Sequence, residues 1–376
     1  MKRAAKLAFW GSAGLLVYTQ LGYPALLAGL DRLRRPRDPD ILPYTDGDVP
    51  DVSLVVAAYN EAPVIDAKVQ NARALDYPAD RLEIVVTSDA SEDRTDELVE
   101  EVAAREPRVR LIRCPRGGKV AAQDRAVRET AGEIVAFSDA NATWAPDTLT
   151  KLVRSFADPE VAYVCGRLVL TDAAGSNREG VYWRFETWLR AQESAVGSVT
   201  GGNGSVYAVR RSDYVEVDPR FGHDLSLPYL IVQRGRRAVY DPQALAFEKP
   251  TPEIETEYRR KVRMFEHCWL IVLRGKMLRR LPAGYLVEIV SHRHLRYGSG
   301  LLHLVVLGTN VALVALRAGL VYDVLLGCQL AFLVLAAVWR GLPRYYALVT
   351  WATVVSLWNY LRRGVPATWD PAEGTR

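Results

Sequence analysis

The sequence has few of the residues and motifs that mark several common classes of protein. Its 376 residues include only four cysteines and five histidines. The cysteines lie far apart, with no C-x-x-C pair and no histidine at zinc spacing, so we expect reduced core residues instead of disulfides or a zinc site. No G-x-G-x-x-G or G-x-x-x-x-G-K-[ST] motif occurs. This argues against a dinucleotide-dependent dehydrogenase and a P-loop phosphotransferase.

The net charge of the chain is small as well. The net charge is +4, and no basic run is interleaved with aromatic residues, so we expect no nucleic-acid partner. Charged residues make up 24% of the chain and hydrophobic ones 49%, as in an ordinary soluble protein. The average hides an uneven distribution, because the apolar residues are concentrated at the two ends of the chain.

Both ends of the chain are predicted to contain membrane segments. Residues 7–30 carry no charge and are long enough to cross ~30 Å of hydrocarbon, so we predict a membrane helix within 1–31 and a linker at 32–50. The stretch is longer than the apolar part of a signal peptide, and no small-residue cleavage site follows it. Three more apolar stretches, 301–316, 321–339 and 345–361, predict three membrane helices within 299–362 and a tail at 363–376. Buried helices of a soluble protein are the alternative.

Basic residues flank these segments. They are concentrated at 32–37 and 274–296, which favours a central domain on the cytosolic side of the cell membrane and a multi-pass protein. Arg362 and Arg363 conflict with this rule, because four spans would leave the C-terminus outside. Residues 274–298 predict an amphipathic helix lying in the membrane interface, with a plain surface helix as the alternative.

Between the apolar ends, residues 51–273 show the pattern of an α/β domain. Short β-branched runs at 52–58, 82–88, 109–113 and 133–139 alternate with amphipathic segments at about 63–75, 94–105 and 119–130, and a further helix is expected from near Pro146. This order predicts a largely parallel sheet with helices on both faces. Ligands of such sheets bind beyond the carboxyl ends of the strands.

Polar residues follow each of these four strands, and two of the clusters suggest a phosphate-bearing ligand. Lys119 follows two glycines and precedes a helix, so a phosphate there would interact with both the ammonium and the helix N-terminus. Asp139 and Asn141 form a D-x-D-like turn that can hold a divalent metal, Mg²⁺ or Mn²⁺. Asp89 can accept hydrogen bonds from a base or ribose. The alternatives are a solvated lysine, a plain turn and a helix cap.

Two later clusters lie further along the chain. The glycines of Thr200–Ser205, among them Gly202 and Gly204 around Asn203, allow close approach of the backbone to a ligand, although a simple hairpin loop is the alternative. Asp224 lies where a helix is expected to begin. We interpret it as a helix N-cap, as a general base, or as both. His223 beside it is structural or lines a polar site.

Two arginines on a later predicted helix are the last candidates. Arg260 and Arg263 are three residues apart and therefore share a helix face. Cations in this arrangement can hold a leaving diphosphate group. A solvated or membrane-facing basic surface is the alternative.

These clusters, in this order, resemble the family 2 glycosyltransferases, in particular their membrane-bound synthase-like branch. The likeness covers roughly 52–296 and the flanking spans. It includes the family's nucleotide-binding start, base-binding aspartate, Gly-Lys segment, D-x-D motif, glycine-rich loop and catalytic carboxylate motif. The matching residues are Ala58, Tyr59, Asn60, Glu61, Asp89, Lys119, Asp139, Gly202, Asn203, Gly204, His223 and Asp224.

The resemblance implies a GT-A-like, Rossmann-type domain that binds a nucleotide-sugar donor through residues 58–61, Asp89, Lys119, Asp139 and the two later arginines. It implies a metal at Asp139 and Asn141, acceptor contacts from residues 202–204 and His223, and Asp224 as the catalytic base. The expected reaction transfers the sugar to a hydroxyl of a lipid-linked or glycan acceptor and inverts the configuration of its anomeric carbon. By family expectation the donor is a UDP-sugar. A role in cell-envelope or extracellular polysaccharide synthesis follows.

Two departures from the family pattern qualify this interpretation. Asn141 replaces the second aspartate of the D-x-D motif, and the family's Q-x-x-R-W motif appears as RKVRM at 260–264. The lost tryptophan would stack on the acceptor sugar, so its absence favours transfer of one or a few sugars. A non-catalytic scaffold with a degenerate domain is the main alternative. A nucleotidyltransferase would need a Gly- and Arg-rich signature that AAYNEAP lacks, and a transporter would need more intramembrane charge.

Overall fold

The computed structural model describes residues 1–33, 49–171, 180–249, 254–339 and 341–368. Most of the predicted linker (32–50) and most of the predicted tail (363–376) lie outside these ranges. The chain divides into two compact units. One comprises 1–29, 253–274 and 286–365, and the other comprises 30–252, 275–285 and 366–376.

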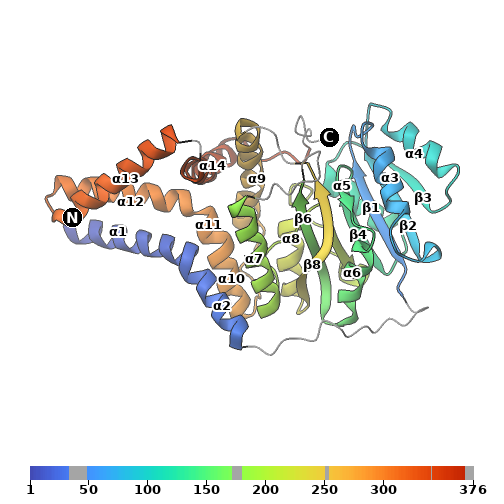
Figure 1. Ribbon diagram of the computed structural model, residues 1–376, viewed down its shortest axis with the longest axis horizontal. Helices are drawn as coiled ribbons and strands as arrows, with labels where there is room; N and C mark the ends of the chain where they lie inside the picture. Colours follow the sequence, from blue (N-terminus) through green and yellow to red (C-terminus); the bar gives the residue numbers. More distant parts are fainter. Residues whose placement is uncertain (34–48, 172–179, 250–253, 340, 369–376) are drawn as a thin grey trace. The chain divides into compact units, whose positions relative to one another are not determined.

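The second unit is built on one eight-stranded sheet with the order β3-β2-β1-β4-β7-β6-β8-β5 (Figure 1). The strands are β1 Val52–Ala58, β2 Leu82–Asp89, β3 Val109–Cys114, β4 Ile134–Asp139, β5 Thr143–Trp144, β6 Val161–Leu170, β7 Val206–Arg210 and β8 Arg237–Glu248. The first four strands are parallel neighbours, as predicted. Beyond them, β7 runs antiparallel between β4 and β6, but β6 and β8 pair in parallel and share the direction of the first four strands. The prediction of a largely parallel sheet is therefore confirmed, with β7 and the short β5 as the reversed strands.

Helices cover both faces of this sheet because the strand side chains alternate between two apolar cores. Leu54 and Val56 of β1 face one core, which is completed by helices α3, α4 and α6. Val55 faces the other, which is completed by α5 and α8. The helices of this unit are α3 Ile65–Arg73, α4 Thr95–Ala103, α5 Lys119–Glu129, α6 Thr148–Arg154, α7 Val181–Val196 and α8 His223–Gln233.

The first unit is helical. Its helices are α1 Lys2–Val17, α2 Tyr23–Leu33 (which continues into the second unit), α9 Ile254–Arg274, α10 Ala283–Glu288 (which begins in the second unit), α11 Leu295–Tyr297, α12 Ser299–Ala315, α13 Leu320–Val338 and α14 Leu342–Arg363. A π-helical turn joins α1 to α2, and another joins α10 to α11. Trp269 of α9 donates its Nε1–H to the carbonyl of Thr353 on α14 (2.9 Å). Phe9 of α1 packs edge-on against Tyr322 of α13.

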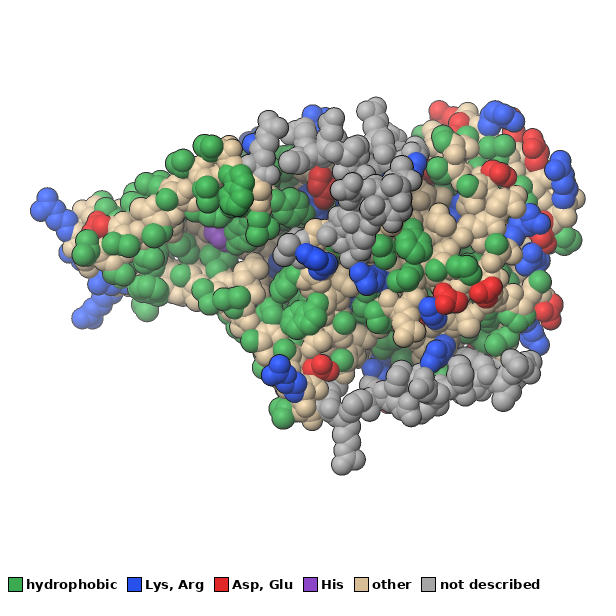
Figure 2. All heavy atoms as spheres, viewed as in Figure 1, with side chains coloured by type: hydrophobic (Ala, Val, Ile, Leu, Met, Phe, Trp, Pro, Cys, Tyr) green, Lys and Arg blue, Asp and Glu red, His purple; other side chains and the backbone are tan. Residues whose placement is uncertain are grey.

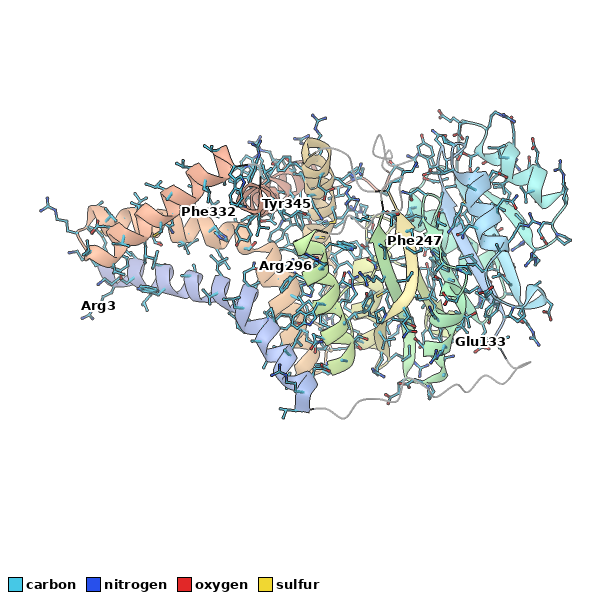
Figure 3. All side chains as sticks on the ribbon, in the orientation of Figure 1. Arg3, Glu133, Phe247, Arg296, Phe332 and Tyr345 are labelled. Carbon is cyan, nitrogen blue, oxygen red and sulfur yellow. The ribbon has the colours of Figure 1, made fainter. Side chains whose placement is uncertain are left out.

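Among the described residues, two helices are long and apolar enough to cross a membrane. They are Lys2–Leu33, with a mean hydropathy of 1.3, and Leu320–Val338, with a mean hydropathy of 2.1. The pair Ala283–Tyr297 and Ser299–Ala315 adds a third if the 61° bend between its helices lies within one span. Many hydrophobic side chains gather on the visible surface of α12 and α13 (Figure 2). Phe332 of α13, labelled in Figure 3, is 37% exposed. α14 does not meet the same criteria, and four spans remain a prediction.

Two sequence expectations need correction. The predicted interface helix at 274–298 is helical only from Ala283, because Lys276 and Arg280 adopt left-handed backbone conformations (φ 54° and 52°) and Pro282 precedes the first turn. The cysteines are not all core residues: Cys114, Cys165 and Cys268 are buried, but Cys328 is exposed on the apolar helix α13.

Candidate active site

Asp89, the last residue of β2, organises the loop that leads into α5. Its buried carboxylate forms an ion pair with Arg116 and accepts hydrogen bonds from the backbone N–H groups of Gly117 (2.7 Å) and Gly118 (3.0 Å). Gly118 has a φ of +91°, a conformation that favours glycine, and Lys119 follows as the first residue of α5. Asp89 therefore fixes the start of the helix. Its contact with a base or ribose remains a prediction.

Arg116 is a candidate that the sequence analysis missed. Its guanidinium carbon lies 3.4 Å from the centroid of the Tyr59 ring, so the two side chains stack at the carboxyl edge of the sheet. Asn60, next to Tyr59, has a φ of 53° and accepts a hydrogen bond from the backbone N–H of Glu92 (2.8 Å). The segment after β1 is thereby held against the loop after β2. The only signal in the sequence was an arginine directly before Gly-Gly-Lys.

Lys119 joins the D-x-D-like turn to the glycine-rich loop. Its ammonium forms an ion pair with Asp139, the last residue of β4, and donates a hydrogen bond to the carbonyl of Gly204 (3.3 Å). The side chains of Lys119 and Asp139 are 24% and 30% exposed, so both can still reach a ligand. Three sequence candidates from distant parts of the chain therefore meet at one point.

The residue types of the D-x-D-like turn, a carboxylate and an amide, are suited to a divalent metal ion. Asp139 supplies a carboxylate and Asn141, two residues later, an amide oxygen. Mg²⁺ is commonly held by one or two carboxylates together with substrate phosphates and water. No group of three His, Cys, Asp or Glu residues suited to a metal is found in the ranges that the structure describes. Metal binding by Asp139 and Asn141 remains a prediction.

Lys68 of α3 supports the same turn, and no sequence motif indicated this role. Its buried ammonium donates a hydrogen bond to the carbonyl of Ala142 (2.7 Å) and lies 5.2 Å from the centroid of the Trp144 ring. Burial lowers the pKa of Lys68 to about 7, against the opposing effect of the Asp139 and Glu248 charges. Periodicity alone does not separate such a lysine from a solvated one.

The glycine-rich loop packs against strand β6 and helix α7, and its backbone is hydrogen-bonded to that of Asp224. The N–H of Gly202 donates to the carbonyl of Asp224 (2.6 Å), and a Cβ at Gly202 would overlap the hydroxyl of Tyr163. Arg190 of α7 donates to the carbonyls of Gly201 and Gly202. Asn203 is buried, and its amide donates to a backbone carbonyl of β6 (2.6 Å). These contacts explain the close backbone approach, and acceptor binding by residues 202–204 remains a prediction.

Asp224 lies in the first turn of α8, and Gly222 is the N-cap, so the N-cap interpretation of Asp224 was wrong. Its side chain is exposed. Within the described ranges its carboxylate forms no hydrogen bond or ion pair, unlike those of Asp89 and Asp139. An exposed carboxylate without a protein partner is open to an acceptor hydroxyl group. Its role as a general base remains a prediction.

His223 is part of a buried network behind Asp224. Its Nδ1 lies 2.9 Å from the hydroxyl of Tyr207, its Nε2 lies 3.3 Å from that of Tyr214, and the Tyr214 hydroxyl donates to Asp124 (2.5 Å). Burial, with a smaller contribution from the Lys119 charge, lowers the pKa of His223 to about 3. Burial raises the pKa of Asp124 to about 6. The burial of His223 favours its structural interpretation over contact with the acceptor.

Arg260 and Arg263 are placed in the other unit, on α9. The predicted helix is confirmed, and the Nε–H of Arg260 donates to Glu257 one turn before it (3.0 Å). Binding of a donor diphosphate by these arginines stays a prediction.

A comparison with known proteins supports the resemblance to the family 2 glycosyltransferases. Residues 53–217 match the model of glycosyl transferase family 2. The chain is 30% identical to a β-monoglucosyldiacylglycerol synthase from a Synechocystis species over 222 residues, which covers 56% of this chain and 46% of the relative. It is also 30% identical to an N-acetylglucosaminyltransferase from Mesorhizobium japonicum, covering 55% of each protein. The chain thus spans about half the length of these curated relatives.

Among solved structures, the fold matches that of a mannosyltransferase from Pyrobaculum calidifontis, crystallised with GDP-mannose and Mn²⁺. The TM-score is 0.71 at 24% sequence identity, and the match covers 96% of this chain and 99% of the other. A match at this identity shows the fold alone. The α/β domain is therefore of the GT-A type, as the resemblance implied.

Proposed function

Because this chain contains a family 2 glycosyltransferase domain, we propose that it is a membrane-bound, inverting glycosyltransferase. It moves a sugar from a nucleoside-diphosphate donor to a hydroxyl of a lipid-linked or glycan acceptor. One observation carries the proposal. Asp224 is exposed, its carboxylate has no partner among the described residues, and its backbone carbonyl is bonded to Gly202 of the glycine-rich loop. Lys119, which pairs with Asp139, contacts the same loop at Gly204. These contacts support a site in which Asp224 is the base and Lys119, beside Asp139, interacts with the diphosphate.

Each group has a distinct task in this reaction. Asp224 accepts the proton of the acceptor hydroxyl as the oxygen attacks the anomeric carbon. Lys119, at the N-terminus of α5, interacts with negative charge that develops on the departing diphosphate. Arg116 and Tyr59 offer a flat surface beside Asp89 for the nucleoside. One displacement inverts the anomeric carbon, so an α-linked donor gives a β-linked product.

A divalent cation, Mg²⁺ or Mn²⁺, is part of the proposal, with Asp139 and Asn141 as its protein ligands. When bound, it would neutralise charge on the diphosphate. Asp139 also binds Lys119, so this carboxylate is shared between two cations, and Lys68 holds the carbonyl of the following turn. The mannosyltransferase crystallised with Mn²⁺ supports a metal but not the choice of ion.

The acceptor class follows from the relatives and the apolar helices. A monoglucosyldiacylglycerol synthase is named for a lipid product, and an N-acetylglucosaminyltransferase for its donor sugar. Two helices of this chain are apolar enough to span a membrane. We infer a cytosolic catalytic domain at the cell membrane, a UDP- or GDP-sugar donor, and a lipid-linked or glycan acceptor used in envelope or extracellular glycan synthesis. Loss of the motif tryptophan at Met264 favours short products.

The test is nucleoside-diphosphate release by the full-length protein in detergent, across a panel of nucleotide-sugars, with and without Mg²⁺ or Mn²⁺ and with membrane extract as the acceptor source. Asp224→Asn should lower turnover by about 10²–10⁴-fold with little change in donor affinity. Asp66→Asn is the matched control, because Asp66 is also an exposed second residue of a helix. Equal loss in both variants, or no release from any donor, would refute the proposal and favour a scaffold.

A further inference from the structure

A basic loop, Gly275–Pro282, connects α9 to α10. It belongs to the second unit, which carries the candidate active site and is called the catalytic unit below. Lys276, Arg279 and Arg280 are exposed, and so is Leu278 between them (48%). Arg234, at the C-terminal cap of α8, is exposed as well. In the part of the chain that the structure describes, none of these four cationic side chains forms a hydrogen bond or ion pair.

The backbone of this loop is fixed. The hydroxyl of Tyr229 donates to the carbonyl of Gly275 (2.9 Å), and the Gln233 amide donates to that of Lys276 (3.0 Å). Met277 is buried to 1% exposure, and the hydroxyl of Tyr285 anchors the following helix to the carbonyl of Val199 (2.9 Å). The loop is thus a rigid part of the catalytic unit.

The loop conformation is also strained. Lys276 and Arg280 both adopt positive φ angles, which is uncommon for long side chains and unfavourable unless the surroundings enforce it. Strain of this kind occurs preferentially at functional sites. Here it presents two cations on either side of the exposed Leu278.

The exposed side chains of this loop indicate which kind of ligand it suits. No aspartate or glutamate occurs between residues 275 and 287, so the three cations of the loop have no acidic neighbour within this segment. An exposed leucine among them suits a surface that is anionic outside and apolar beneath. The candidate membrane segment Ala283–Ala315 begins three residues after Arg280 along the chain. We propose that Lys276, Arg279, Arg280 and Arg234, with Leu278, dock the catalytic unit on anionic phospholipid headgroups.

The test uses the full-length chain in nanodiscs of neutral phosphatidylcholine or of phosphatidylcholine with phosphatidylglycerol. Leu278→Cys is introduced together with Cys328→Ser, because the remaining cysteines are buried. Labelling by an uncharged, bulky maleimide should be at least about fivefold slower in the anionic discs, since each basic residue near such a surface strengthens binding roughly fivefold. High salt should restore labelling because it shortens the screening length.

Matched variants decide whether the cations are responsible. Arg279→Gln with Arg280→Gln should restore labelling in the anionic discs to within about twofold of the neutral value. Arg94→Gln with Arg105→Gln removes two exposed arginines of the α4 region and should leave protection unchanged. A cysteine at the exposed Ala104 should react equally in both discs.

Three outcomes would overturn the proposal: equal labelling of residue 278 in both lipids, protection that survives the arginine changes, and protection by inorganic pyrophosphate in neutral discs. The last would assign the surface to a soluble phosphate ligand. The labelling readout does not depend on turnover, so its failure is distinguishable from failure of the proposed glycosyl transfer.

Discussion

Asp124→Asn should stabilise the protein, and the gain should grow with pH. Asp124 lies on α5 with 6% exposure, where burial raises the pKa of its carboxyl from 3.8 to about 6. The folded protein therefore holds this proton more tightly than the unfolded chain does. Ionised Asp124 destabilises the fold above pH ~6, and the penalty disappears as the pH falls towards ~4. Asparagine keeps the shape and an oxygen acceptor for the Tyr214 hydroxyl.

The magnitude follows from the two pKa values. A difference of about 2 pKa units corresponds to roughly 3 kcal/mol at pH 8, and the same linkage leaves about 0.5 kcal/mol at pH 4. For a domain of this size, 1 kcal/mol shifts the thermal midpoint by about 2–4 °C. The midpoint of Asp124→Asn, followed by tryptophan fluorescence in detergent, should therefore rise relative to wild type by roughly 5–10 °C between pH 4 and pH 8.

Asp93→Asn is the control, with the opposite sign. Partial burial opposes ionisation of Asp93, but hydrogen bonds from Thr95 and Ala62 outweigh it and hold its pKa below 3.8. Ionised Asp93 therefore stabilises the fold above the unfolded pKa, and the contribution is lost as the pH falls through the folded value. A midpoint difference for Asp124→Asn that stays constant with pH, or that shrinks towards pH 8, would refute the reasoning.

Three further predictions concern the site. Gly202→Ala should abolish activity and lower the thermal midpoint, because its Cβ would overlap the Tyr163 hydroxyl, whereas Gly204→Ala meets only ordinary contacts and should fold normally; comparable midpoints for the two would contradict this. Arg116→Ala should raise the donor KM by about tenfold with a smaller change in kcat, as seen by steady-state kinetics, and a pure kcat effect would argue against nucleoside binding. Lys68→Met should raise the half-activating metal concentration by roughly tenfold in a metal titration, and an unchanged value would exclude support of the turn.

The repeating pattern of short apolar runs and amphipathic segments was enough to place the first four strands within a residue of their observed ends. Such runs are bounded by polar residues that cannot be buried in a strand, so the boundary is local. The same locality placed Lys119 at the start of α5 and Asp139 at the end of β4. Parallel strands end at one edge, so the grouping of these residues could also be predicted.

The rest depended on contacts between distant segments. Burial distinguishes Lys68 and His223 from solvated residues of the same types, and burial is a property of the packed chain. The stacking of Arg116 on Tyr59, and the bond between the Gly202 N–H and the Asp224 carbonyl, join segments that no periodicity links. The left-handed turns at Lys276 and Arg280 interrupted a segment whose pattern favoured a helix.

The sequence by itself therefore determined the elements, the four neighbouring parallel strands at one side of the sheet and the order of the polar clusters, because these follow from local pattern and strand direction. Only the tertiary structure decided that β7 is inserted antiparallel, that Asp89 is engaged with the Gly117–Gly118 backbone while Asp224 remains exposed, and that Asp124 is buried. The physical reason is that solvent exposure and hydrogen-bond partners are set by which surfaces meet after folding, and they in turn set the pKa and the reactivity of each group.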